Sequence, residues 1–312
     1  MKGTRAVLAL AVASLLTGCS TSGSQEARET PPAVLPNPEE YRGAPIPMPL
    51  DAHQFDLEDE RRLEQAIHTV SRTCMESFGL DWPRPRRDPG PSTIESRRYG
   101  VTDERFIKKF GYSPPAPANM TWEEIGRSHS KSRERTARIP ETTRRIYTGE
   151  KTGKHDGRQI PEGGCRGEAY RKMGMDKPEI PYASEINHLR LTAWKQARQS
   201  PTVRKAADKW RVCMQDAGYD YRTPEEVIAS PHWAGTERKP SWVEMTKPST
   251  EEVDTAVADV RCKKSSLFAE SWRAAETENQ ASARADNGEV LRKAKTAHAE
   301  VRRAIREVLA GR

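Results

Sequence analysis

Five cysteines carry most of the chemistry that this sequence offers. The first, Cys19, ends the motif Leu16-Thr17-Gly18-Cys19, which follows a basic start and a short apolar stretch over residues 6–16. This order of segments is typical of a lipoprotein signal peptide. The apolar stretch is too short for a permanent membrane helix, which needs about 20 apolar residues. The sequence therefore predicts cleavage after residue 18 and a diacylglycerol on Cys19; an ordinary secretory peptide is the alternative.

The other four cysteines belong to an internal repeat. Residues 74–82 (CMESFGLDW) match residues 213–221 (CMQDAGYDY), and each copy is followed by one further cysteine, Cys165 or Cys262. Cysteines outside the cytoplasm are expected to be oxidised, and four allow three pairings. We favour Cys74–Cys165 with Cys213–Cys262, because each pair stays within one copy. In the loop-entropy model each bond would stabilise the fold by about 4 kcal/mol.

Metal and redox chemistry are the alternatives for these cysteines. The four lie far from one another in the sequence, and no histidine falls beside one at ligand spacing. The aromatic residues that end the two copies, Trp82 and Tyr221, are expected to plug the core under each disulfide; a ligand cage is the alternative. We predict no metal site, no cofactor and no catalytic residue, since the chain also lacks a nucleophile elbow, a zinc-protease motif, a P-loop and a dinucleotide fingerprint.

The elements that must position these cysteines are helices. Apolar residues at helical spacing predict a helix over residues 57–78 that ends at Gly79, and another over residues 201–217 that ends at Gly218. Further helices are expected at the following ranges: 102–110, from residue 121, 164–173, 184–199, from residue 223, and 249–309 with a break at 287–288. No β-alternation of useful length appears. The sequence predicts a mainly α protein of disulfide-stapled helical modules, long irregular proline-rich loops and a long C-terminal helical region.

Composition divides the chain into four parts. After the signal peptide, residues 1–18, we expect a proline-rich tether over residues 19–55, although its end, Pro45 to Phe55, could instead lie as a strap on the body. A first helical Cys module with a basic irregular insert is expected over residues 56–180. A second Cys module with the long C-terminal helix is expected over residues 181–312.

The basic insert is the main charge feature of the chain. Between Pro83 and Ile160 there are 18 Lys or Arg against 10 Asp or Glu, within a whole-chain charge of +7. Outside the cytoplasm such a surplus would meet lipid headgroups or anionic polymers rather than nucleic acid. A solvated loop without a partner is the simpler interpretation.

These motifs resemble a group of uncharacterised actinobacterial secreted lipoproteins with a repeated Cys-Met-x-x-x-Gly helix module. The matching segments are the signal motif 16–19 and residues 74–79, 97–103, 163–165, 210–221 and 258–263. The resemblance implies an exported, lipid-anchored helical protein and brings no activity and no functional residues with it. It also points to an accessory role in envelope export.

Three functions remain open at this stage. The first is a lipid-anchored interaction or transport-accessory module held in the membrane through Cys19, with an envelope protein as partner. Its best candidate contact is the apolar seam from Val290 to Val308, for which internal packing is the alternative. The second is a solute- or anionic-polymer-binding lipoprotein, and the third is an enzyme of unrecognised class.

Overall fold

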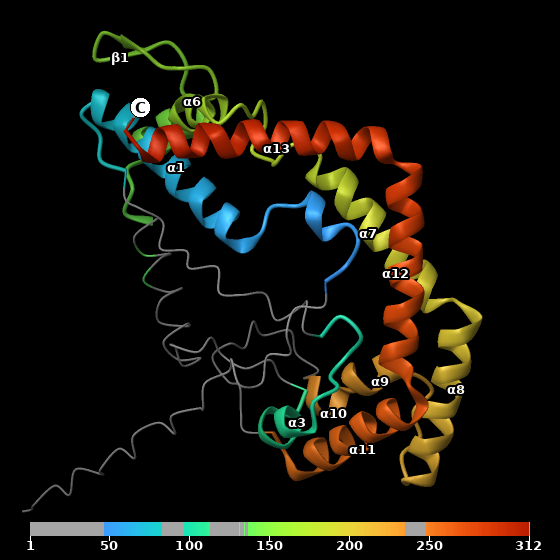
Figure 1. The fold of residues 1–312 in the computed structure, drawn as a ribbon. Helices are drawn as coiled ribbons and strands as arrows, with labels where there is room; N and C mark the ends of the chain where they lie inside the picture. Colours follow the sequence, from blue (N-terminus) through green and yellow to red (C-terminus); the bar gives the residue numbers. More distant parts are fainter. Residues whose placement is uncertain are drawn as a thin grey trace, which may run out of the picture. The chain divides into compact units, whose positions relative to one another are not determined.

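The structure is a computed structural model that describes residues 47–82, 97–112, 131, 134, 137–234 and 248–311. Its described part is mainly helical, as the sequence predicted (Figure 1). The helices are α1 (Leu57–Ser77), α3 (Glu104–Phe110), α5 (Glu141–Thr148), α6 (Gly164–Lys172), α7 (Ala183–Arg198), α8 (Pro201–Asp216), α9 (Pro224–Ile228), α10 (Pro231–Ala234), α11 (Thr250–Ser266), α12 (Phe268–Asp286) and α13 (Gly288–Leu309). A short 3-10 helix, η2 (Asp51–His53), precedes α1, and one hairpin joins β1 (Lys154–His155) to β2 (Arg158–Gln159).

The starts of α1, α8 and α11 follow from capping residues. Asp56 and Asp59 form a capping box at the start of α1, in which the Asp56 side chain accepts from the Asp59 backbone N–H at 2.7 Å. Ser200 caps α8 ahead of a proline in its first turn, and Ser249 caps α11. α3 begins two residues after its expected start at residue 102, because the carboxylate of Asp103 caps it by accepting from the Arg105 backbone N–H at 2.8 Å. The helix expected from residue 121 lies outside the described residues.

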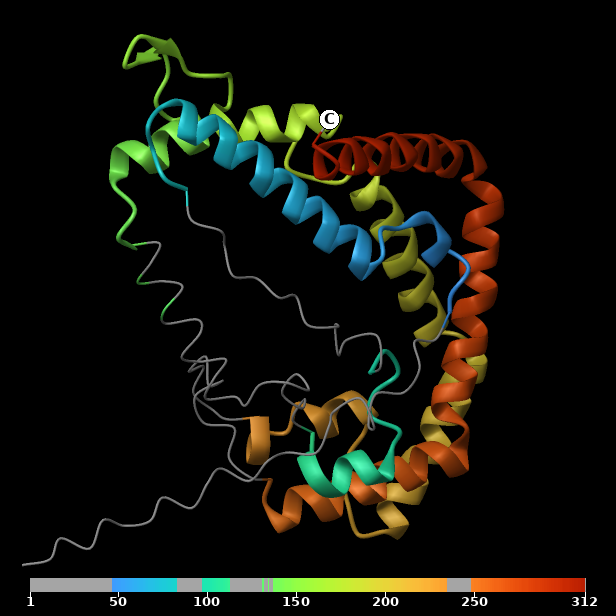
Figure 2. The ribbon, with the colours of Figure 1, turned by 60° about the vertical axis from the view of Figure 1, so that its left-hand side comes forward.

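The helices pack in two sets that share the C-terminal region. α1 packs on α6 and α13, and α5 packs on α6 (Figure 1). α7 and α8 pack on α12, while α8 and α3 pack on α11 (Figure 2). The expected module boundary between residues 180 and 181 separates α1 from α13. These two helices pack on each other, so the boundary does not coincide with a break in the packing.

The prediction of an extended tether is wrong for residues 47–55. These residues instead lie on the body as a strap, which was the alternative. Met48 is 5% exposed and Leu50 is fully buried. The Leu50 backbone N–H donates to Gln280 Oε1 on α12 at 3.1 Å, and Leu50 packs with Leu291 and Ala294 of α13. Apolar side chains that bury this much surface hold the strap on the body.

The apolar seam of α13 is internal, so its candidacy as an exposed contact is wrong. The buried side chains of α13 include Leu291, Val301 and Ile305. Val301 and Ile305 belong to a core cluster with Leu63 and Val70 of α1. The C-terminal part of the seam is therefore covered by the protein's own first helix, and Ala294 packs with Leu50 and Ile186.

The C-terminal helical region breaks twice, where one break was expected. Asn287 ends α12 as expected, and Leu267 separates α11 from α12 with a left-handed backbone of φ +55°. A leucine gives no sequence signal for this conformation, which favours glycine. Sequence reasoning also missed α5 and the β1–β2 hairpin, both of which are short.

Gly164, at the start of α6, allows the closest backbone approach in the first set of helices. It has φ +68°, and a Cβ atom there would overlap the carbonyl oxygens of Ile146 and Tyr147 in α5. We expect Gly164→Ala to lower the free energy of unfolding by about 3 kcal/mol, through both backbone strain and the overlap. Gly153→Ala is the matched control, since Gly153 has φ +81° with nothing within 4 Å of the added atom. Urea denaturation should show the larger loss for Gly164→Ala; equal losses would contradict the close approach.

Candidate functional site

Both expected disulfides are present in the structure. Cys74 of α1 bonds Cys165 of α6, and Cys213 of α8 bonds Cys262 of α11. The two loops that they close span 91 and 49 residues. Each copy of the repeat is therefore bonded to a later helix. Of the three possible pairings, this is the one that the repeat favoured.

The two copies also share the same local backbone. After each helix the chain turns back, so that the Leu80 N–H donates to the Met75 carbonyl at 3.1 Å and the Tyr219 N–H donates to the Met214 carbonyl at 2.9 Å. Both methionines are fully buried. The glycine that precedes Leu80 or Tyr219, Gly79 in the first copy and Gly218 in the second, has a positive φ, which this helix ending requires.

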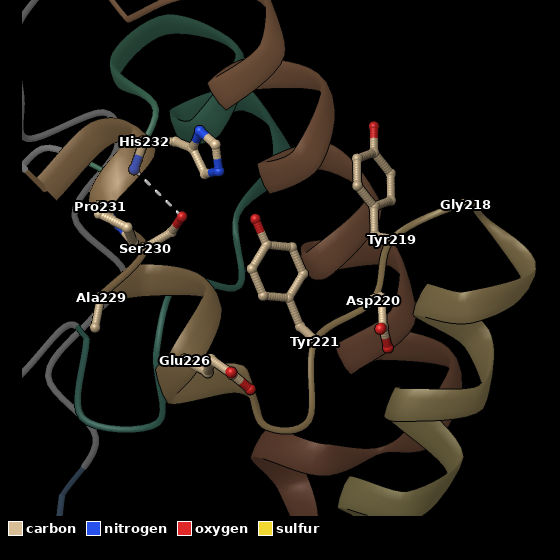
Figure 3. Close-up of a pocket in the computed structure, with 9 residues that line it drawn as sticks. All are labelled: Gly218, Tyr219, Asp220, Tyr221, Glu226, Ala229, Ser230, Pro231 and His232. Carbon is tan, nitrogen blue, oxygen red and sulfur yellow. Dashed lines mark hydrogen bonds between the residues drawn. The ribbon is translucent and has the colours of Figure 1, made fainter.

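The copies differ at their final aromatic residue. In the first copy, Trp82 stacks on Tyr147 with ring centroids 3.7 Å apart and packs beside the Cys74–Cys165 disulfide, as a core plug should. In the second copy, the ring of Tyr221 lies 6.4 Å from that of Trp233 and is tilted by 50°. Beside Tyr221 lies a hollow of about 450 Å³ (Figure 3). It is lined by Gly218, Tyr219, Asp220, Tyr221, Glu226, Ala229, Ser230, Pro231 and His232.

The polar groups around this hollow, which we call the Tyr221 hollow, have different environments. The Tyr221 hydroxyl points toward the His232 ring and Ser230, whereas the carboxylates of Asp220 and Glu226 point to the opposite side (Figure 3). Glu226 accepts from the backbone N–H of Arg222 at 2.8 Å and from its guanidinium at 3.3 Å. These hydrogen bonds lower the pKa of Glu226, so this carboxylate is already occupied.

Behind the hollow lies a buried charge network centred on Asp259 of α11. The Asp259 carboxylate accepts from Lys263 Nζ at 2.7 Å, from Trp210 Nε1 at 2.9 Å and from the Tyr112 hydroxyl at 3.2 Å. Asp259 is fully buried and Lys263 is 1% exposed. Burial raises the pKa of Asp259, an effect that the Lys263 ammonium opposes. Burial also raises the pKa of Tyr112, whose ring stacks on Trp233 at 5.5 Å and so connects the network to the hollow.

A second buried network fastens the segment 97–112 and the strap to α12. The fully buried Glu276 accepts from the Arg98 guanidinium, from the Tyr99 hydroxyl at 2.9 Å and from Gln280 Nε2 at 2.7 Å. Gln280 in turn accepts from the strap through Leu50. Sequence reasoning missed both networks. The spacing of four residues between Asp259 and Lys263 was a signal, but such pairs are usually exposed on a helix surface.

Other expected features fall largely outside this region. Cys19 and much of the basic insert lie outside the described residues. In the described part of the chain, no group of His, Cys, Asp and Glu side chains could hold a metal ion. None of the described helices is long and apolar enough to cross a membrane.

Comparisons of the chain with family models, with curated proteins and with solved structures yielded no match.

Proposed function

We propose that the protein is a lipid-anchored binding module on the extracytoplasmic face of the cell membrane, without enzymatic activity. The observation that carries this proposal is the pair of disulfides within a helical body, because structural disulfides persist in oxidising compartments. The signal motif 16–19 supports it independently, since Cys19 would receive the diacylglycerol after export. Two acyl chains are enough for stable anchoring.

Binding is the activity that the described surface supports best. Val301 of the α13 seam packs on α1, and Ala294 packs on the strap and α7, whereas the Tyr221 hollow is open and has the volume of a small-ligand site. No lysine or arginine is among the described residues that line it. The hollow therefore favours a small solute over an anionic polymer as its ligand. An accessory role in the envelope would require a protein partner in addition.

Removing the Cys19 thiol tests the anchor. We expect Cys19→Ala to appear in the soluble fraction or as an uncleaved precursor, because only a thiol at that position can accept the lipid. Ser20→Ala is the matched control, since it changes the next residue and leaves the thiol in place. Membrane fractionation followed by mass measurement is the readout. A Cys19→Ala protein that is processed and membrane-bound like its parent would contradict the anchor.

A further inference from the structure

We propose that the Tyr221 hollow binds a neutral saccharide. This inference deepens the proposed function by naming a ligand class for the binding module. It is independent of the lipid anchor, because it depends only on side chains of the second repeat copy and of the segment that follows it.

The repeat provides an internal comparison for this hollow. At the position of Tyr221, the first copy has Trp82 stacked face to face on Tyr147, with an interplanar angle of 16°. In the second copy, Tyr221 also packs against a core cluster, the one around Trp210, and a hollow lies between it and residues 229–232. The two copies thus share a helix ending and a core-facing aromatic residue, and the second copy carries this hollow beside that residue.

The side chains around the hollow suit a ring that has apolar faces and polar edges. Tyr219 and Tyr221 each pack one side on the core cluster around Trp210 and Met214 and remain partly exposed on the other. Aromatic faces pack against the C–H faces of a sugar ring, while phenol hydroxyls supply hydrogen bonds at its edge. The Tyr221 hydroxyl, the Ser230 hydroxyl and the His232 ring lie together on one side (Figure 3). Hydroxyl and imidazole groups can both donate to and accept from the hydroxyl groups of a sugar, and the Ser230 hydroxyl oxygen also accepts from the His232 backbone N–H at 3.4 Å.

Charge around the hollow argues against ionic ligands. An anion would require Lys or Arg side chains in the lining, and none is present among the described residues there. An organic cation would require carboxylates beside the aromatic faces. Asp220 and Glu226 instead point away from the two phenol hydroxyls, and Glu226 is paired with Arg222 (Figure 3).

The walls of the hollow are held in place before any ligand binds. The Trp233 indole N–H donates to the Val227 carbonyl at 3.0 Å, and Thr223 caps α9 through the Glu226 N–H at 3.2 Å. On the other side, the turn after Met214 and the Cys213–Cys262 bond hold the residues that carry Tyr219. A site ordered in advance loses little conformational entropy on binding.

Calorimetric titration of the full chain with two neutral trisaccharides, maltotriose and N,N′,N″-triacetylchitotriose, tests the proposal. The chain should be purified in a polyoxyethylene detergent, because a sugar-headed or choline-headed detergent would compete for the site. We expect saturable binding of at least one trisaccharide, weakened about 10-fold or more by Tyr221→Ala and by Tyr219→Ala. Tyr221→Phe, which keeps the ring and removes the hydroxyl, should weaken binding less. Leu80→Ala, the same position as Tyr219 in the first copy, should have no effect.

The outcomes separate this inference from the proposed function. Circular dichroism should first show that each variant keeps the helix content of the parent. Absence of saturable heat with both trisaccharides up to about 10 mM, a range that covers millimolar affinity, would overturn the saccharide assignment. Binding that survives both alanine variants, or tyrosine-dependent binding of choline chloride or inorganic phosphate in place of a sugar, would overturn it too. Failure of the anchor would instead appear only in the membrane fractionation of Cys19→Ala.

Discussion

Lys263→Met is expected to lower the free energy of unfolding by about 4 kcal/mol, because it leaves the Asp259 carboxylate buried without its cation. Lys263 Nζ lies 2.7 Å from Asp259, and both side chains are buried. Replacing both residues leaves no uncompensated carboxylate, but the Trp210 and Tyr112 donors then lose their acceptor. Asp259→Leu combined with Lys263→Met should therefore recover part of the loss. Urea denaturation at neutral pH, with the disulfides kept oxidised, measures these differences.

The loss in Lys263→Met should also depend on pH. Burial already raises the pKa of Asp259 from its ordinary value, and Lys263 is the largest influence that lowers it again. Without Lys263 the folded-state pKa of Asp259 rises further above the unfolded value of about 3.9. Between these two pKa values the folded state binds more protons than the unfolded state, so the penalty should shrink as the pH falls from 7 toward 4.

The neighbouring lysine supplies the control for this prediction. Lys264 is exposed on the same helix, and Lys264→Met should change the free energy of unfolding by less than about 0.5 kcal/mol. A Lys263→Met protein as stable as Lys264→Met would show that the Asp259 network is not buried in solution.

Removing the second disulfide is expected to have a similarly large effect. We expect Cys213→Ala with Cys262→Ala to lower the free energy of unfolding by about 4 kcal/mol, since the bond closes a loop of 49 residues and restricts the unfolded chain. Alanine is preferred to serine because Cys262 is 2% exposed and a buried hydroxyl would add its own cost.

Two comparisons make this prediction specific to the bond. Cys74→Ala with Cys165→Ala should cost a similar amount, because its loop is longer, at 91 residues, and the entropic term grows slowly with length. A reductant breaks both disulfides of the parent, so it should lower the free energy of unfolding by more than either double variant does, and it should have no effect on a variant in which all four cysteines are replaced. A parent that is equally stable with and without reductant would contradict both disulfides.

Local signals explain why much of the helical fold could be predicted from the sequence. α1 ends one residue before the expected end, because Gly79 adopts the left-handed conformation that stops a helix. α8 begins at the predicted proline behind Ser200, whose hydroxyl accepts from the Val203 N–H at 3.3 Å. Capping and helix-ending residues act within one turn, so a single sequence contains all that they need.

Long-range packing explains what the sequence could not reveal. The strap depends on Gln280, which lies 230 residues away from Leu50 and accepts its N–H. The α13 seam has the same apolar spacing whether it faces solvent or α1, so spacing alone left both alternatives open. Leu267 breaks the helix in a conformation for which its own side chain gives no signal.

The candidate site was only partly predictable for the same reason. The repeat identified Trp82 and Tyr221 as equivalent positions and left open whether each plugs the core or lines a ligand site. Both rings pack against a core cluster; Trp82 stacks on Tyr147 at 3.7 Å, whereas Tyr221 lies 6.4 Å from Trp233 and also lines the hollow. Neither contact is visible from the motif itself.

Mass spectrometry of the protein isolated from its own membranes, digested without reduction, tests the anchor and the disulfide pairing together. We expect three species: a peptide pair linked through Cys74 and Cys165, a pair linked through Cys213 and Cys262, and an amino-terminal peptide that begins with a diacylglyceryl Cys19. Together they would establish export, anchoring and the pairing within each repeat copy. Free thiols at the four paired positions, a Cys74–Cys213 link, or an unmodified amino terminus at Met1 would contradict a lipid-anchored, disulfide-stapled protein.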